Sequence, residues 1–212
     1  MFIKKYLRKL RLFNKFAITK KIYGTVCANP INMSSAPGNS FLFFAPHPDD
    51  ELLGCAGLMQ ILKSQQKNVY VFFSNHTTNG RKIEAQKVSE TLEIPYFFIE
   101  TNFKNEVKEI LEKYQITTIL LPHLLDNHPQ HFSTVKELYI LCKNSFFKDY
   151  KFLMYEVWTP LIPNIVIDIS AYFDRKIELL KIYESQLQTK DYISVICGLN
   201  AYRAALLEKK AE

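Results

Sequence analysis

The chain has 212 residues, of which 48% are hydrophobic and 23% charged, which suffices for one ample domain with its own hydrophobic core. No uninterrupted apolar run approaches the roughly 18 residues that a membrane-spanning helix needs, so the sequence predicts no membrane span. The four cysteines form no Cys-x-x-Cys pair, which argues against a disulfide framework and a thiolate zinc site and favours a reducing, cytoplasmic compartment.

The net charge of +6 is concentrated at the N-terminus. Residues 1–38 contain eight of the 27 cations and no acid, which leaves 19 cations against all 21 acids in the rest of the chain. Because the main part of the chain is therefore slightly acidic, a nucleic-acid partner is not expected.

The first 24 residues combine these cations with apolar residues spaced three and four apart, a pattern typical of an amphipathic helix. One interpretation is a peripheral anchor on the cytoplasmic face of an anionic membrane. The others are a helix packed on the chain's own domain and a basic tail. We expect residues 1–38 to form this extension together with most of a linker at residues 29–40. Residues 39–212 are expected to form the main domain.

From residue 41 onward, short apolar runs rich in β-branched and aromatic residues alternate with helical patterns. Strands are expected at 41–45, 68–74, 95–100, 116–122, 151–158 and 164–169, and helices at about 51–66, 81–92, 103–114, 129–145, 173–187 and 198–209. This alternation predicts an α/β fold, a doubly wound and mostly parallel sheet with helices on both faces. In such sheets, ligands bind at the carboxyl ends of the strands, near the point where the strand order reverses.

Ionisable residues are concentrated just after the strand expected at 41–45, in the sequence APHPDDELLG. His47, Asp49, Asp50 and Glu51 place one imidazole and three carboxylates within five positions, where a buried strand meets a helix. Carboxylates in a first helical turn also complement the helix dipole, so helix capping alone is a second interpretation of this motif.

A second concentration follows the strand expected at 116–122. It contains His123, Asp126, His128 and His131. In both segments a His-Pro pair stands between strand and helix, so Pro48 and Pro129 are each expected to open a helix. A doubly wound order places these two strand ends side by side, which favours one functional site over two separate structural motifs.

The spacing within the two segments assigns roles. His47 and Asp50 are three residues apart and can face one point, as can His128 and His131. A catalytic zinc ion takes three protein ligands and keeps a position for water, which predicts His47, Asp50 and His131 as ligands. Asp49 points about 100° away from Asp50 and is expected to be the general base. His128 is expected to stabilise an oxyanion or to protonate a leaving amine.

These residues resemble the signatures of the GlcNAc-phosphatidylinositol de-N-acetylases, the PIG-L or LmbE-like zinc deacetylases. APHPDDE is similar to the first signature of the family, and DNHPQH to the second, usually written His-Pro-Asp-His. Residues 81–94 resemble an Arg-x-x-Glu-Ala segment of the family, and residues 164–187 its C-terminal region. The likeness extends over most of residues 41–187.

The resemblance implies a Rossmann-like deacetylase of N-acetylated amino sugars with the same roles for His47, Asp49, Asp50, His128 and His131. Ferrous iron shares the zinc ligands and is the alternative metal ion. The sequence departs from the family at one position, because Gln130 replaces the aspartate of His-Pro-Asp-His. If that carboxylate normally supports a charged histidine, the neutral amide is expected to lower the pKa of His128.

Further expectations concern the surroundings of the site. Arg81 is expected to contact a substrate hydroxyl or phosphate, with a solvated helix start as the alternative. Tyr155 and Trp158 are expected to contact the sugar, since indole faces stack on sugar rings, with a place at the edge of the core as the alternative. The residues expected to support the ligands and catalytic groups are Glu51, Asp126 and Gln130.

The leading hypothesis is a zinc-dependent N-deacetylase of an N-acetylhexosamine such as N-acetylglucosamine, in a glycoconjugate or glycoside. A lipid-linked sugar of cell-envelope or surface-polysaccharide synthesis fits if residues 1–24 contact a membrane. The alternative is a membrane-associated carbohydrate-binding protein in which Gln130 marks impaired catalysis. Phosphoester hydrolysis ranks last, because many such enzymes use two metal ions. The sequence does not define an oligomeric state.

Overall fold

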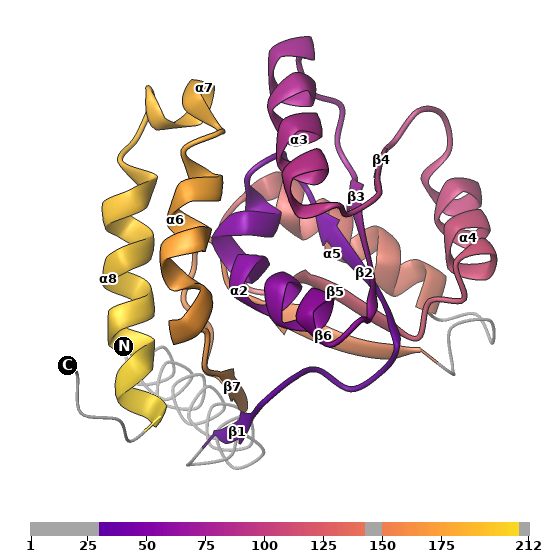
Figure 1. Cartoon of the computed structure of the whole chain (residues 1–212). Coiled ribbons are helices and arrows are strands. Elements are labelled where there is room, and N and C mark those ends of the chain that lie inside the picture. Colours follow the sequence, from indigo (N-terminus) through magenta and orange to yellow (C-terminus); the bar gives the residue numbers. More distant parts are fainter. Residues whose placement is uncertain (1–29, 143–149, 208–212) are drawn as a thin grey trace, which may run out of the picture.

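The computed structural model describes residues 30–142 and 150–207 (Figure 1). The amphipathic segment predicted at residues 1–24 lies outside this part of the chain. Within the described residues, no helix is both long and apolar enough to cross a membrane.

The main sheet consists of five parallel strands in the order β4-β3-β2-β5-β6. Its strands are β2 (Ser40–Ala45), β3 (Asn68–Phe73), β4 (Tyr96–Phe98), β5 (Thr118–Pro122) and β6 (Lys151–Tyr155). After β2, the chain adds β3 and then β4 on one side of the sheet. It then crosses back and adds β5 and β6 on the other side of β2. The strand order therefore reverses between β2 and β5, which confirms the predicted doubly wound fold.

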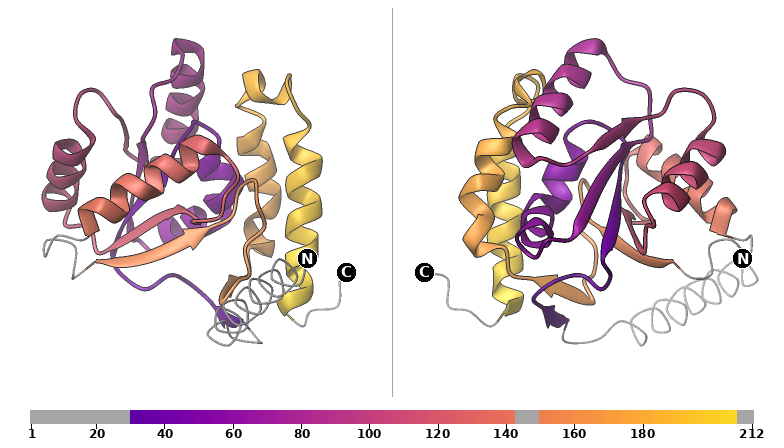
Figure 2. Two further views of the ribbon diagram at one scale, coloured as in Figure 1. Left: turned by 180° about the vertical axis from the view of Figure 1, so that it is seen from behind. Right: turned by 45° about the vertical axis from the view of Figure 1, so that its right-hand side comes forward.

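Helices cover both faces of this sheet (Figure 2). The flanking helices are α2 (Asp50–Ser64), α3 (Asn79–Leu92), α4 (Phe103–Lys113), α5 (Pro129–Cys142) and α6 (Phe173–Leu180). In β2, Phe41 and Phe43 pack in a core with residues of α2, α3 and α6, whereas Leu42 and Phe44 pack in a second core with residues of α4 and α5. Successive side chains of a strand point to opposite faces, so one fully apolar strand supplies both cores.

The C-terminal part of the chain adds a layer on the α2 side of the sheet. It contains the short helix η2 (Ser170–Tyr172), then α6, α7 (Glu184–Leu187), α8 (Tyr192–Ala204) and η3 (Ala205–Leu207). Figure 1 shows α6 and α8 side by side, with α7 next to α3. This layer lies outside the alternation of strand and helix that builds the sheet.

The structure corrects three element predictions in the terminal parts of the domain. Residues 31–33, expected in the linker, form β1 (Ile31–Met33), which pairs in parallel with β7 (Ile165–Ile167) apart from the main sheet. The helix expected at 173–187 is divided into α6 and α7 because Tyr183 turns inward between them. The helix expected at 198–209 begins at Tyr192, where Asp191 caps the backbone N–H of Ser194.

The two His-Pro pairs also differ. Pro129 is the first residue of α5, as predicted. Pro48 lies in a turn before α2, and the helix begins only at Asp50. The reason is the backbone of Asp49, whose φ of 123° is not helical and separates Pro48 from the helix.

Candidate metal centre

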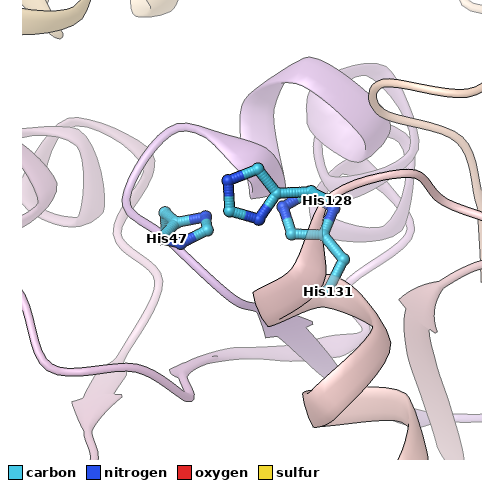
Figure 3. Close-up of side chains that lie close together, drawn as sticks. All are labelled: His47, His128 and His131. Atoms are coloured by element: carbon cyan, nitrogen blue, oxygen red, sulfur yellow. The ribbon is translucent and has the colours of Figure 1, made fainter.

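The loops after β2 and β5 bring three histidines together at the point where the strand order reverses. Figure 3 shows the His47 ring on the loop after β2 facing His128 and His131, which lie at the start of α5. The ring centroids are 5.4 Å apart for His47 and His131 and 4.7 Å apart for each pair with His128. One nitrogen from each ring lies within 4.8 Å of the others, so the three rings are close enough to hold a metal ion.

The carboxylate of Asp50 lies between two of these rings. Its Oδ2 is 3.1 Å from Nδ1 of His47 and 3.1 Å from Nε2 of His131, and it accepts the backbone N–H of His47 at 2.9 Å. Two ligands bound about 2.0–2.2 Å from one tetrahedral ion lie roughly 3.3 Å apart. Both distances to Oδ2 of Asp50 are therefore close to the separation of two ligands of one metal ion.

His131 supplies a second indication. The ring is fully buried, yet neither nitrogen has a hydrogen-bond partner of acceptable geometry. Nε2 faces Asp50 and Nδ1 lies 3.3 Å from Oδ1 of Asp126, close contacts without the alignment of hydrogen bonds. Buried polar atoms of this kind are rare, and a cation at Nε2 satisfies one of them. The residues present therefore fit a divalent metal ion.

The pKa shifts of Asp50 and His131 agree with a metal ion at this point. Burial raises the pKa of the Asp50 carboxyl, but the contacts with His131 and His47 outweigh burial and hold its pKa below the ordinary value. Burial lowers the pKa of His131, but Asp50 and Asp126 outweigh burial and raise that pKa. Asp50 is thus an ionised carboxylate whose counter-charge is supplied by the imidazoles or by a metal ion.

Asp49 is buried beside this set but does not converge on it. Its Oδ2 lies 3.7 Å from Nη2 of Arg81, and its backbone φ of 123° is a conformation that non-glycine residues rarely adopt, at a cost of about 1–3 kcal/mol. Burial, followed by the charges of Asp50 and Glu51, raises the pKa of Asp49 well above its ordinary value, and Arg81 partly offsets this. Backbone strain at a buried carboxylate is typical of functional positions.

Glu51 supports the backbone of Asp49. One carboxylate oxygen accepts the Asp49 N–H at 3.0 Å, and the other accepts the hydroxyl of Tyr183 at 2.6 Å. Burial raises the pKa of Glu51 to about 7, although these hydrogen bonds lower it. Glu51 therefore faces away from the three converging atoms and holds Asp49 in place, as a supporting residue would.

Gln130 contacts a different histidine from the one expected. Its side-chain oxygen lies 2.6 Å from Nε2 of His47, and only its backbone N–H reaches His128, at Nδ1 and 3.3 Å. The pKa of His128 is lowered, by burial first and then by the charges of His131 and His47. The direction agrees with the sequence-based expectation, but the side chain of Gln130 is not the cause.

Asp126 and His123 hold the loop before α5. Asp126 is buried and accepts the backbone N–H groups of His128 and Trp158, each at 3.0 Å, besides lying next to His131. His123 accepts the N–H of Leu125 at Nδ1, so its Nε2 donates to the carbonyl of Thr159. Asp126 thus orients the segment that carries His128 and His131, and His123 fixes the same loop through its two hydrogen bonds.

A cavity of about 190 Å³ opens over the cluster. Its lining residues are His47, Asp49, Asp50, Arg81, His128, Gln130, Trp158 and Tyr192. Arg81 and Trp158, which were predicted as substrate contacts, both line this cavity. Tyr155 does not line the cavity, because it is buried and its hydroxyl donates to the carbonyl of Phe44 at 2.6 Å.

Tyr192 and Tyr183 were missed by sequence reasoning. Tyr192 lines the cavity from the start of α8, with its ring 5.4 Å from that of Trp158. Tyr183 reaches Glu51 from between α6 and α7. An aromatic residue near a helix end carries no motif, so no local sequence pattern indicated either role.

A wider depression of about 480 Å³ lies at the C-terminal end of α3, lined by residues from Ser89 to Tyr96. Its walls are mostly apolar, and none of the three clustered histidines lines it. The smaller cavity at the switch point is therefore the candidate site.

A known protein family matches the part of the chain that carries the candidate site. Residues 42–141 match PIG-L, described as GlcNAc-PI de-N-acetylase. This segment begins in β2 and ends in α5, so it includes both loops of the candidate site. This part of the chain is therefore similar to the PIG-L family, as the sequence motifs predicted.

Solved structures share the fold of this chain over most of its length at low sequence identity. The conserved protein TT1542 from Thermus thermophilus has 18% identity and a TM-score of 0.68 over 80% of this chain and 90% of its own. The N,N'-diacetylchitobiose deacetylase of Pyrococcus horikoshii has 17% identity and a TM-score of 0.59 over 83% and 79%. These likenesses confirm the α/β fold.

One further structure shows that this fold carries more than one reaction. GalB of Pseudomonas putida KT2440, a 4-carboxy-2-hydroxymuconate hydratase, has 15% identity and a TM-score of 0.57 over 82% of this chain and 92% of its own. The reaction of a domain with this fold must therefore be argued from its site.

Proposed function

We propose that this domain is a zinc-dependent hydrolase that removes the N-acetyl group from an N-acetylated amino sugar of a glycoconjugate or glycoside. The observation that carries the proposal is the convergence of His47, Asp50 and His131 on one point next to the buried carboxylate of Asp49. The family description and the deacetylase among the similar structures support this reaction class.

The atoms that would hold the ion are Nδ1 of His47, Oδ2 of Asp50 and Nε2 of His131. A divalent ion at that point would lower the pKa of a water molecule and polarise the acetamide carbonyl. Imidazole and carboxylate ligands suit zinc and also ferrous iron, so zinc is the proposed ion and iron the alternative.

Asp49 would accept a proton from the attacking water molecule, since its carboxylate lines the cavity but lies outside the converging set. His128 has Nδ1 occupied by the Gln130 N–H, so its neutral ring carries the proton on Nε2. That N–H would stabilise the oxyanion that develops on the carbonyl. A proton from Asp49 or His128 then leaves with the amine, and the products are acetate and the free amino sugar.

The size of the cavity limits how much of the substrate enters. At about 190 Å³ it is smaller than the 300–1,000 Å³ of typical ligand pockets. The acetamido group and part of one sugar ring would therefore occupy it, with Trp158 and Tyr192 beside the ring. The rest of a glycoconjugate would lie on the protein surface.

The alternative is a carbohydrate-binding protein with impaired catalysis, and the observation that favours it is Gln130 in place of the family's aspartate. A phosphoester hydrolase with two ions is less favoured, since the described residues hold a single cluster of this kind.

The test is acetate release from a panel of N-acetylglucosaminyl substrates, measured beside the metal content of the purified protein. Release that stops with a chelator and returns with added zinc is expected. Protein that retains metal and binds the sugars but releases no acetate would favour the carbohydrate-binding alternative. Addition of water to an unsaturated acid without acetate release would favour a hydratase.

We also propose that the substrate is lipid-linked and that residues 1–24 contact an anionic membrane surface, on the basis of their eight cations and amphipathic spacing. Deletion of residues 1–29 spares β1, which begins at Ile31, and is expected to release the protein from the membrane fraction. An unchanged distribution would contradict the membrane contact.

A further inference from the structure

A short C-terminal segment, residues 183–186, contacts the region of the site at three places. The hydroxyl of Tyr183 donates to Glu51 at 2.6 Å. Ser185 donates its hydroxyl to Oε2 of Glu84 at 2.6 Å and its backbone N–H to Oε1 at 2.8 Å. Gln186 accepts a hydrogen bond from Arg81. In Figure 1 this segment lies around α7, next to α3 and on the side of α2.

The first contact leads to the backbone of Asp49. Glu51 accepts the Asp49 N–H with one oxygen and the Tyr183 hydroxyl with the other. Both Glu51 and Tyr183 are 1% exposed, so this chain of hydrogen bonds is screened from water. The positive φ of Asp49 persists only if neighbouring groups hold it, and Glu51 is the group that binds its N–H.

The third contact leads to the side chain of Asp49. Arg81 lies 3.7 Å from the Asp49 carboxylate and lines the cavity, while Gln186 accepts from the same nitrogen, Nη2. The Ser185–Glu84 pair fixes α7 to α3, the helix that carries Arg81. Backbone and carboxylate of Asp49 are thus held by the same segment through two independent routes.

We propose that residues 183–186 position Asp49 for catalysis, with Tyr183 and Gln186 as positioning residues that do not touch the substrate. The catalytic part of this inference rests on the proposed function, whereas the support of the Asp49 backbone is a property of the folded chain. A misplacement of about 1 Å in a reacting group lowers rates by up to about 100-fold, so the support has a measurable consequence.

The test compares Tyr183→Phe with Thr118→Val. Thr118 is fully buried and its hydroxyl donates to the carbonyl of Pro37 at 2.5 Å, at the opposite end of the sheet, so both changes remove one buried hydroxyl. Hydrogen exchange of the Asp49 amide, followed by NMR, reports on the backbone without any substrate. In Tyr183→Phe we expect this exchange to accelerate at least about tenfold and kcat to fall by about 10- to 100-fold with KM nearly unchanged. Thr118→Val is expected to change neither.

Gln186→Ala tests the second route and stays informative if Tyr183→Phe does not fold. Gln188→Ala is its control, since Gln188 is exposed and Arg81 donates to Gln186 and to no side-chain atom of Gln188 in the described part of the chain. We expect a loss of about tenfold in kcat for Gln186→Ala, unchanged metal content, and no loss for Gln188→Ala.

Three results distinguish the positioning role of residues 183–186 from the proposed deacetylase function. Asp49 exchange no faster in Tyr183→Phe than in Thr118→Val would overturn the positioning role, as would wild-type kcat in both Tyr183→Phe and Gln186→Ala. Wild-type protein without acetate release would overturn the proposed function alone, and the amide exchange would still decide whether residues 183–186 hold Asp49.

Discussion

Asp49 and Asp50 are adjacent carboxylates in different surroundings. Asp50 lies 3.1 Å from a nitrogen of His47 and of His131, whereas Asp49 faces Arg81. Asp49→Asn keeps the shape of the side chain but removes the proton acceptor, so kcat is expected to fall by about 10²- to 10⁴-fold while the metal content stays near that of the wild type. Acetate release and metal analysis of the same preparation measure both quantities.

The matched comparison is Asp50→Asn, the same change one residue further on. It is expected to lose metal, because it removes an anionic ligand and leaves the His47 and His131 nitrogens with a weaker donor. Metal loss from Asp49→Asn together with retention by Asp50→Asn would reverse the roles of the two aspartates.

The side-chain oxygen of Gln130 contacts the ring of His47. Because its oxygen lies 2.6 Å from Nε2 of His47, that nitrogen carries the ring proton and Nδ1 is left to face Asp50. Gln130→Met removes the acceptor at similar length and is expected to weaken metal binding by about 10- to 100-fold, measured by competition with a chelator of known affinity. Gln130→Glu keeps an oxygen there and is expected to bind within a few fold of the wild type. Equal affinity in all three proteins would leave Gln130 without this role.

At the scale of elements, β2 and β5 explain why the candidate ligands were predictable. Both strands read as continuous apolar runs, which identifies a doubly wound sheet and places their carboxyl ends side by side before any contact is known. The His-Pro pairs then mark where each strand passes into a helix. The φ of Asp49 could not be predicted in the same way, because Pro48 in a His-Pro pair indicates a helix start. The Asp49 N–H is instead bound by Glu51, which Tyr183 holds from 132 positions further along the chain.

The close packing of α2 on β6 depends on one glycine. A Cβ on Gly54 would lie 2.3 Å from Cδ2 of Tyr155, whose ring cannot move freely because its hydroxyl is bound to the carbonyl of Phe44. Gly54→Ala is therefore expected to lower the free energy of unfolding by about 1–3 kcal/mol, measured by urea denaturation. The control is Gly198→Ala in α8, where a Cβ meets nothing within 4 Å and alanine is expected to stabilise the helix by about 0.5–1 kcal/mol. A stabilised Gly54→Ala protein would show that α2 and β6 can separate at no cost.

At the scale of the whole molecule, the layer of α6, α7 and α8 completes a site that the sheet begins. Tyr183, Gln186 and Tyr192 all lie beyond residue 141, where the family match ends. Tyr183 is 132 residues away from Glu51 in the chain, and β1 pairs with β7 across a comparable distance. Contacts of this length leave no periodicity or motif in a single sequence, so local patterns cannot reveal them.

The attachment of this layer involves a buried cation. Lys176 of α6 is 2% exposed and donates to the carbonyl of Leu53 in α2 at 2.8 Å and to the side chain of Asn200 in α8 at 3.1 Å. Within the described residues it forms no ion pair, and burial lowers its pKa from 10.5 to about 8. Lys176 therefore links α2, α6 and α8, but removing its charge from water costs free energy.

The depressed pKa of Lys176 predicts how stability depends on pH. Between pH 8 and about 10.5 the unfolded chain binds the proton that the folded chain has released, so this residue makes the free energy of unfolding rise with pH, by roughly 3 kcal/mol in total. Lys176→Met removes the contribution, so the stability of the wild type relative to this variant is expected to increase from pH 7.5 to 10.5 in urea denaturation. Lys181→Met, which changes an exposed lysine at the end of the same helix, is expected to leave the pH profile close to that of the wild type. Parallel profiles of the wild type and Lys176→Met would mean that the Lys176 ammonium is not desolvated where α2, α6 and α8 meet.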